Sequence, residues 1–153
     1  MRPFTLLEVS ERVRNGANSV KEFSEFLDYF YDRTTQAQMI ACLADEPLIL
    51  DDQRLNALYA ASADYLSKRY RLSFTPKWVY DPKRFLDEPW FSTTEEDLRE
   101  YLTFTSPSEF RSRNIFTEAV PLRRARTWQA EQRVEQWLSE PLDHPVHSPA
   151  FSR

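Results

Sequence analysis

The sequence predicts an all-α protein, an irregular bundle of about six to seven helices. First, Gly16 is the only glycine, whereas tight hairpin turns depend on glycine. Second, most of the ten prolines separate segments in which apolar residues recur every three or four positions. Third, hydrophobic residues make up 41% of the 153 positions, which is enough to build the core of one domain. Helices joined by proline-containing loops satisfy all three observations.

Four helices are predicted in the first half of the chain, because each segment has an apolar stripe and a suitable cap residue. Gly16 is placed to end the first helix, and Ser19 with Glu22 forms a capping box at the start of the second. Asp51 or Asp52 can cap the fourth helix. The predicted spans are residues 5–14, 19–31, 34–43 and 51–70. The fourth helix is expected to bury one stripe, made of Leu55, Leu58, Tyr59, Ser62, Tyr65 and Leu66.

Residues 71–92 predict an ordered loop, rich in proline and aromatic residues, that packs over the helices. Asp81 followed by Pro82 is typical of the cap and first position of a one-turn helix, expected to run through Leu86. Several large aromatic side chains rarely stay exposed to water together. We therefore expect this loop to be held against the helices.

The second half of the chain predicts further helices. Thr93 or Thr94, followed by acidic residues, can begin one helix, and the Ser106–Pro107 pair with Glu109 can begin a short one. The predicted spans are a helix over residues 93–104, a short helix after residue 106, an extended segment over 114–116 and a last helix over about 121–139. The last helix is expected to place Ala130, Val134, Trp137 and Leu138 on one face.

The domain prediction is a single helical domain over residues 1–140, followed by a flexible tail over residues 141–153. Both histidines, His144 and His147, fall in this tail. Pro145 between them opposes the helix that could bring the two imidazoles onto one metal ion. We therefore predict no metal site there.

Composition limits the classes of function. The net charge is −4, so binding to nucleic acid through overall charge is not indicated. The chain shows no secretion signal and no long apolar run, so we expect a cytoplasmic protein without membrane association. Cys42 lies among apolar neighbours and is expected to be a small buried residue.

The usual parts of an enzyme are missing from the pattern. A phosphate-binding loop and a serine elbow both need glycines, and the predicted core has no histidine for acid–base catalysis. Paired carboxylates occur where helix caps and first turns favour acids. Asp28 and Asp32 lie one turn apart and could hold a cation, but they lie on the polar side of their helix. We therefore expect no enzyme, no cofactor and no catalytic or metal-binding residue.

The aromatic loop is the first candidate binding surface, because tryptophan is enriched at the centres of protein interfaces. The alternative is that these side chains only pack into the core. The candidate partner-binding residues of this loop are Trp78, Asp81, Phe85, Trp90 and Phe91.

The second candidate is a basic segment between Pro107 and Arg133, in which six arginines stand against three acids. Arginine is suited to phosphate groups and to stacking on aromatic rings, so an anionic partner is one interpretation. The other is a solvated face that pairs with the protein's own acids. The candidate residues are Arg111, Arg113, Arg123, Arg124 and Arg126.

Five segments give the chain a family resemblance. They resemble an uncharacterised family of short bacterial all-α proteins, above all in the run Asp81–Pro82–Lys83–Arg84–Phe85–Leu86–Asp87–Glu88–Pro89–Trp90–Phe91. The other segments are Val20–Phe30, Ala44–Leu50, Tyr59–Tyr70 and Ser106–Phe116. The resemblance covers roughly residues 5–125. It implies a bacterial protein associated with nucleotidyltransferase-like or toxin–antitoxin gene pairs, and it implies no catalytic residue.

The sequence thus favours a non-enzymatic interaction protein, the antitoxin-like or accessory partner of a cognate bacterial protein. Two alternatives stay open. One is a DNA-associated transcriptional regulator with an N-terminal helix-turn-helix, although the third helix has no Arg or Lys to read bases. The other is an enzyme that uses carboxylates with a metal ion. The sequence does not indicate an oligomeric state.

Overall fold

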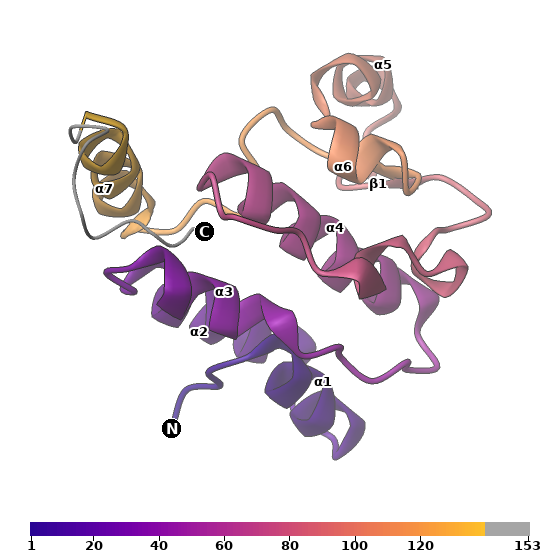
Figure 1. Cartoon of the computed structure of the whole chain (residues 1–153). Coiled ribbons are helices and arrows are strands. Elements are labelled where there is room, and N and C mark those ends of the chain that lie inside the picture. Colours follow the sequence, from indigo (N-terminus) through magenta and orange to yellow (C-terminus); the bar gives the residue numbers. More distant parts are fainter. Residues whose placement is uncertain (140–153) are drawn as a thin grey trace.

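The computed structural model describes residues 1–139, and within them seven α-helices make up most of the fold (Figure 1). The all-α prediction is confirmed, while the predicted tail lies outside the described residues. The helices are α1 (Leu6–Arg14), α2 (Ser19–Tyr31), α3 (Gln36–Ala44), α4 (Gln53–Arg69), α5 (Glu96–Thr105), α6 (Ser108–Arg111) and α7 (Thr127–Ser139). Two 3-10 turns, η1 (Lys77–Tyr80) and η2 (Pro82–Arg84), and two short strands, β1 (Trp90–Phe91) and β2 (Ile115–Phe116), complete the described part.

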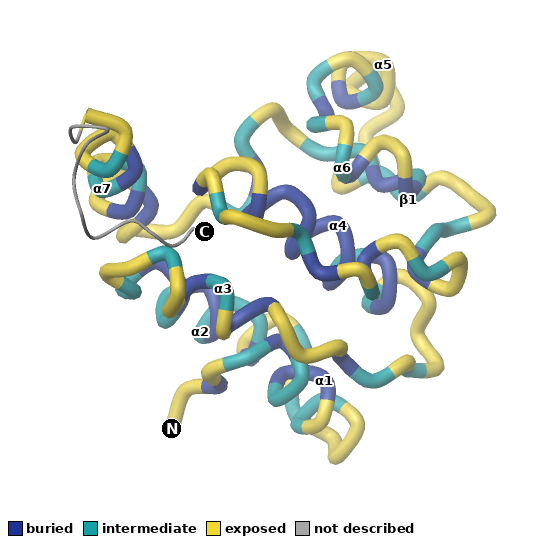
Figure 2. Tube along the Cα trace, in the orientation of Figure 1, coloured by how far each residue is buried: buried dark blue, intermediate teal, exposed yellow. Residues whose placement is uncertain are grey.

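Helix α4 is the central element of the bundle. In Figure 1 it lies between α1, α2 and α3 on one side and α5, α6 and β1 on the other. Every residue from Tyr59 to Ser67 is buried, and Figure 2 shows this helix as mostly dark blue. The prediction of a single buried stripe is therefore wrong, because this part of α4 is buried on all sides. Small residues such as Ala57, Ala60 and Ala61, each fully buried, let neighbouring elements approach α4 from more than one side.

Aromatic side chains fill the core between α2 and the end of α4. Phe30 is fully buried and meets Tyr31 and Tyr70 edge to face, with ring centroids 5.7 and 5.6 Å apart. Burial raises the pKa of both tyrosine hydroxyls, because the phenolate form would lose its hydration. The Tyr31 hydroxyl donates to the carbonyl oxygen of Leu122 at 2.7 Å, which ties the segment before α7 to this core.

Cys42 is buried on α3, as predicted, and its thiol lies 3.4 Å from the Gln38 carbonyl oxygen. Burial raises the pKa of the Cys42 thiol to about 12, because the thiolate would be poorly hydrated there. The thiol therefore stays protonated at neutral pH, which suits a packing role.

The start of α2 differs from the predicted capping box. Asn18, not Ser19, is the N-cap residue: its backbone is extended and its side-chain oxygen accepts from the Lys21 amide at 2.9 Å. Glu22 instead pairs with Arg12 of α1 at 3.1 Å, so it joins two helices. The helix begins at Ser19 because the Asn18 side chain, one residue before it, accepts a hydrogen bond from a backbone amide of the first turn.

Replacing Asn18 by alanine is expected to lower the free energy of unfolding by about 1 kcal/mol, since one helix-terminal amide loses its acceptor. The measurement is urea denaturation followed by circular dichroism. Ser19→Ala is the matched control and should cost less, because Ser19 already lies inside the helix. An equal or larger loss for Ser19→Ala would restore the capping box as the correct assignment.

The loop over residues 71–92 is ordered, as predicted, and is held against α3 and α4. The indole nitrogen of Trp78 donates to the Leu43 carbonyl oxygen at 3.1 Å, and Val79 is fully buried. Asp81 caps η2 by accepting from the Lys83 amide, but this turn is 3-10 and ends at Arg84. The predicted one-turn helix is therefore shorter than expected.

A parallel two-stranded ribbon links this loop to the second half of the chain. Trp90 lies opposite Ile115 and Phe91 opposite Phe116, and the Trp90 amide donates to the Asn114 carbonyl oxygen at 2.8 Å. The extended segment predicted over residues 114–116 is confirmed. Its partner, β1, lies in the segment predicted as a loop, where no strand was expected.

Helix α7 begins at Thr127, later than the predicted start near Pro121. Leu122 has φ of 64°, a left-handed conformation that a right-handed helix cannot contain. Thr127 then accepts from the Arg124 amide through its hydroxyl at 2.8 Å. Within α7, Ala130 and Val134 are buried as predicted. Leu138, which was expected on the same buried face, is 61% exposed. Among the helices of residues 1–139, none combines the length and the apolar character needed to span a membrane.

Candidate interaction surface

Two arginines are buried beside α4 and join elements that are distant in sequence. Arg84 donates to the Pro47 carbonyl oxygen at 2.6 Å and to Glu46 at 3.3 Å, and its guanidinium lies 5.0 Å from the Trp78 ring centroid. Burial lowers the pKa of Arg84, although the Glu46 carboxylate opposes the shift. Arg84 therefore attaches the aromatic loop to the segment that precedes α4.

Arg113 has the same role farther along α4, at Asp64. It donates to the Asp64 carboxylate at 3.1 Å and to the carbonyl oxygens of Glu109 and Val79, each at 2.7 Å. Its guanidinium lies 4.6 Å from the Phe85 ring centroid. Arg113 is only 1% exposed, so its assignment as a partner-binding residue is corrected: it joins α4, α6 and η1 in the interior.

The aromatic candidate residues of the loop are partly buried and not fully exposed to solvent. Trp78 and Trp90 are half-buried and contact the hydrophobic core. Phe85 and Asp81 are also half-buried, and Asp81 serves as a cap. Phe91 stacks on Phe116 with centroids 4.8 Å apart. The candidate aromatic residues of this loop are thus partly buried, whereas Phe74 and Tyr80 of the same loop are 47% and 54% exposed.

Two of the candidate arginines pair with the protein's own acids. Arg124 makes a two-pronged contact with Asp28, with both nitrogen–oxygen distances 2.9 Å, and Arg126 donates to Asp32 at 2.7 Å. Asp28 and Asp32 therefore each pair with an arginine side chain. Arg124 lowers the pKa of Asp28, because a hydrogen-bonded guanidinium favours the carboxylate form.

Because the folded-state pKa of Asp28 is lowered, its stabilising effect is present above its ordinary pKa near 4 and is lost as the pH falls below that value. Asp28→Asn is expected to lower the free energy of unfolding by about 0.5–1 kcal/mol at pH 7. The loss should shrink as the pH falls below about 4 in urea titrations across this range. Asp45→Asn, an exposed acid at the end of α3, is the control. A loss for Asp28→Asn that does not change with pH would contradict the ion pair.

Arg111 and Arg123 are the remaining candidates, and both are exposed. They belong to different segments, one at the end of α6 and the other between β2 and α7. The structure therefore does not gather the five arginines into one basic patch. It distributes them between the interior, the junction with α2, and the open surface.

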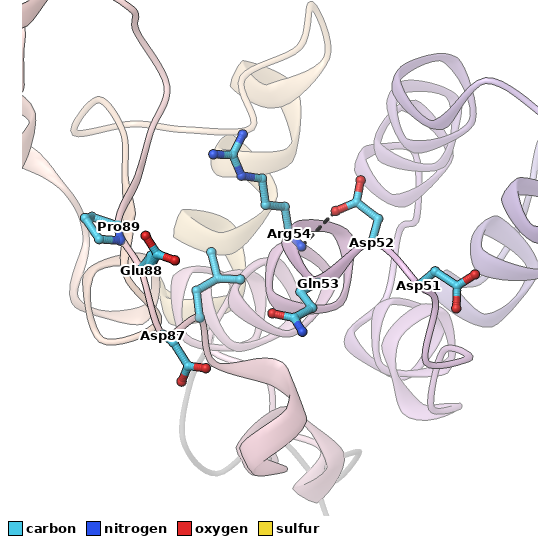
Figure 3. A pocket seen from close by; sticks show the side chains of 8 residues that line it. Asp51, Asp52, Gln53, Arg54, Asp87, Glu88 and Pro89 are labelled. Atoms are coloured by element: carbon cyan, nitrogen blue, oxygen red, sulfur yellow. Dashed lines mark hydrogen bonds between the residues drawn. The ribbon is translucent and has the colours of Figure 1, made fainter.

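An open groove of about 460 Å³ lies between the start of α4 and residues 86–89 (Figure 3). Asp51, Asp52, Asp87 and Glu88 line it, but Figure 3 shows Asp51 and Asp87 directed away from each other. Asp52 is the N-cap of α4 and accepts from the Arg54 amide at 2.9 Å, as Figure 3 shows. Within residues 1–139, no three His, Cys, Asp or Glu side chains are grouped as metal ligands would be.

Helix α3 offers little for reading DNA. Its exposed residues are Ala37, Gln38, Ala41 and Ala44, which carry no charge. Base reading in the major groove relies chiefly on Arg, Lys, Asn and Gln, and phosphate contacts add to the affinity. Gln38 is also engaged, because its side-chain oxygen accepts from the Thr34 amide at 3.0 Å. No observation on α3 favours the helix-turn-helix alternative.

The clearest apolar surface is on α5, which the sequence analysis did not single out. Leu98, Tyr101 and Phe104 are 43%, 60% and 76% exposed, at helical spacings that make them neighbours on one side of the helix. Only Leu102 of α5 is buried, and Figure 2 shows the helix as mostly yellow. We call Leu98, Tyr101 and Phe104 the α5 face.

Helix α5 packs beside the β1–β2 ribbon through the side opposite Tyr101 and Phe104. Arg99 places its guanidinium 5.2 Å from the Phe91 ring centroid, and α5 ends where Thr105 and Ser106 donate to the Thr117 carbonyl oxygen. The side of α5 that carries Arg99 and Leu102 thus faces the ribbon, and the side that carries Tyr101 and Phe104 faces solvent. The spacing of residues 98, 101 and 104 already indicated an apolar stripe in the sequence. Such a stripe usually packs into the core, so the sequence did not indicate that this one is exposed.

Comparison of the chain with known protein families, with curated proteins and with solved structures found no match. The family resemblance of the five segments therefore stays a prediction.

Proposed function

We propose that this chain is a non-enzymatic interaction protein that binds a cognate protein partner through the α5 face, as the antitoxin-like or accessory member of a bacterial pair. The observation that carries the proposal is the exposure of Leu98, Tyr101 and Phe104 together on one helix. Single exposed apolar residues are common on protein surfaces, whereas adjacent ones are typical of contact surfaces.

The energetics of α5 support a partner. A helix of ten residues is marginal by itself in water, and most helical stability in proteins comes from packing one face. Helix α5 buries only Leu102 in this chain, while its two aromatic rings remain in water. Covering aromatic side chains of this kind is a main source of binding energy at protein interfaces.

The test is co-purification of tagged protein from its native cells, comparing the wild type with Tyr101→Asp and Phe104→Asp. The wild type should retain one stoichiometric partner, and both variants should lose it. Trp128→Asp is the matched control, because Trp128 is 66% exposed on α7, away from α5 in Figure 1. Circular dichroism checks that each variant is folded. A partner-free wild type, or equal loss with Trp128→Asp, would contradict the proposal.

A further inference from the structure

Each exposed aromatic ring of α5 has a carboxylate one helical turn before it. Asp97 precedes Tyr101 by four residues and Glu100 precedes Phe104 by four, and both acids are exposed. Residues four apart are neighbours on a helix surface. The α5 face therefore presents two adjacent pairs, each with one aromatic ring and one negative charge.

The interior of the same protein shows what fits such a pair. Arg113 pairs with Asp64 while its guanidinium lies against Phe85. Arg84 similarly pairs with Glu46 while its guanidinium lies against Trp78. A planar guanidinium can satisfy both groups at once, because it donates in its plane and stacks through its flat face.

We propose that the partner segment bound by the α5 face carries arginine side chains that pair with Asp97 and Glu100 and stack on Tyr101 and Phe104. This inference rests on the proposed function and adds the chemistry of the partner to it. Leu98, at the edge of the face, would contact an apolar residue of the same segment.

Charge also argues against a second copy of this chain as the occupant. Helix α5 and its N-cap carry four carboxylates, on Glu95, Glu96, Asp97 and Glu100. Arg99 is the single basic residue of this helix, and it is turned toward the Phe91 ring. Two α5 faces in contact would bring like charges together, whereas a basic segment would relieve that repulsion.

The test uses three synthetic amphipathic helices that share one leucine pattern and carry arginine, lysine or citrulline at the same positions. Citrulline keeps the planar shape of the arginine head group and removes its charge. Binding is measured by fluorescence anisotropy with the full chain, and amide chemical shifts locate the contact. The arginine peptide should bind tightest, with shifts centred on residues 95–105, and the citrulline peptide should bind about tenfold more weakly.

Asp97→Asn and Glu100→Gln should each weaken binding of the arginine peptide by up to about fivefold and should leave the citrulline peptide unaffected. The control is Glu11→Gln with Glu135→Gln, which removes two exposed carboxylates from α1 and α7. Equal weakening by this control would show long-range charge attraction and overturn the site.

Other outcomes separate this inference from the proposed function. If the citrulline peptide binds as tightly as the arginine peptide, the arginine inference is overturned while an apolar partner surface remains. If no peptide binds, the arginine inference is overturned, and co-purification decides the proposed function by itself. If sedimentation shows a wild-type dimer that Phe104→Asp abolishes, the occupant is a second copy and the arginine inference is wrong.

Discussion

Replacing Arg113 by alanine is expected to lower the free energy of unfolding by about 3–5 kcal/mol, because the buried Asp64 would lose its buried charged partner and keep only the exposed Lys68. The substitution also removes the donors to the Glu109 and Val79 carbonyl oxygens. The measurement is the midpoint and slope of urea denaturation at neutral pH. A loss of this size is a large fraction of the stability of an ordinary domain.

Two further variants define the cause of that loss. Arg111→Ala, two residues earlier and exposed, should change the free energy of unfolding by less than about 0.5 kcal/mol. Arg113→Lys keeps the charge but cannot reproduce the forked donor geometry, so it should recover only part of the stability. Full recovery with lysine would mean that charge alone matters. A small loss for Arg113→Ala would show that Lys68, 2.9 Å from the other oxygen of Asp64, suffices to compensate the carboxylate.

Replacing Phe30 by alanine is expected to lower the free energy of unfolding by about 3–5 kcal/mol. Phe30 is fully buried, and its removal would leave a cavity against the rings of Phe26, Tyr31 and Tyr70. Thermal unfolding followed by circular dichroism, together with urea titration, measures the effect. Because the cavity adds to the lost burial, the cost should exceed the transfer energy of the ring.

Val20→Ala is the matched control for Phe30, because Val20 lies on the same helix and is 74% exposed. Its effect should stay within about 0.5 kcal/mol, since no core contact is lost and alanine is a better helix former. Similar losses for the two variants would contradict the central position of the aromatic cluster. A much larger loss for Phe30→Ala than for Val20→Ala would locate the stabilising contacts of α2 on its buried face.

Local signals in the sequence were sufficient for most of the helices. The cap of α4, predicted as Asp51 or Asp52 and found to be Asp52, and the terminating Gly16 act within a few residues, so local sequence was enough to predict them. The same holds for the burial of Cys42 among apolar neighbours. The start of α7 failed as a prediction, because the left-handed backbone at Leu122 is held by a contact with Tyr31 from a distant helix.

The candidate surfaces were harder to predict, because exposure depends on what the rest of the chain covers. Arg113 and Arg124 look alike in the sequence, yet one is buried against Asp64 and the other bridges to Asp28 near the surface. An apolar stripe on a helix is also ambiguous. The stripe of α2 is covered by α1 and α7 and by Tyr59 of α4, whereas α5 packs beside β2 and leaves Leu98, Tyr101 and Phe104 exposed.

The sequence by itself determined the helical class, the order of the helices and the absence of glycine-dependent loops, since hydrophobic spacing and caps act over one or two turns. Only the tertiary structure decided which charges are internal, which aromatic rings are packed and which helix remains uncovered. These outcomes depend on contacts between residues far apart in the chain, such as Arg113 with Asp64, and no local pattern encodes them.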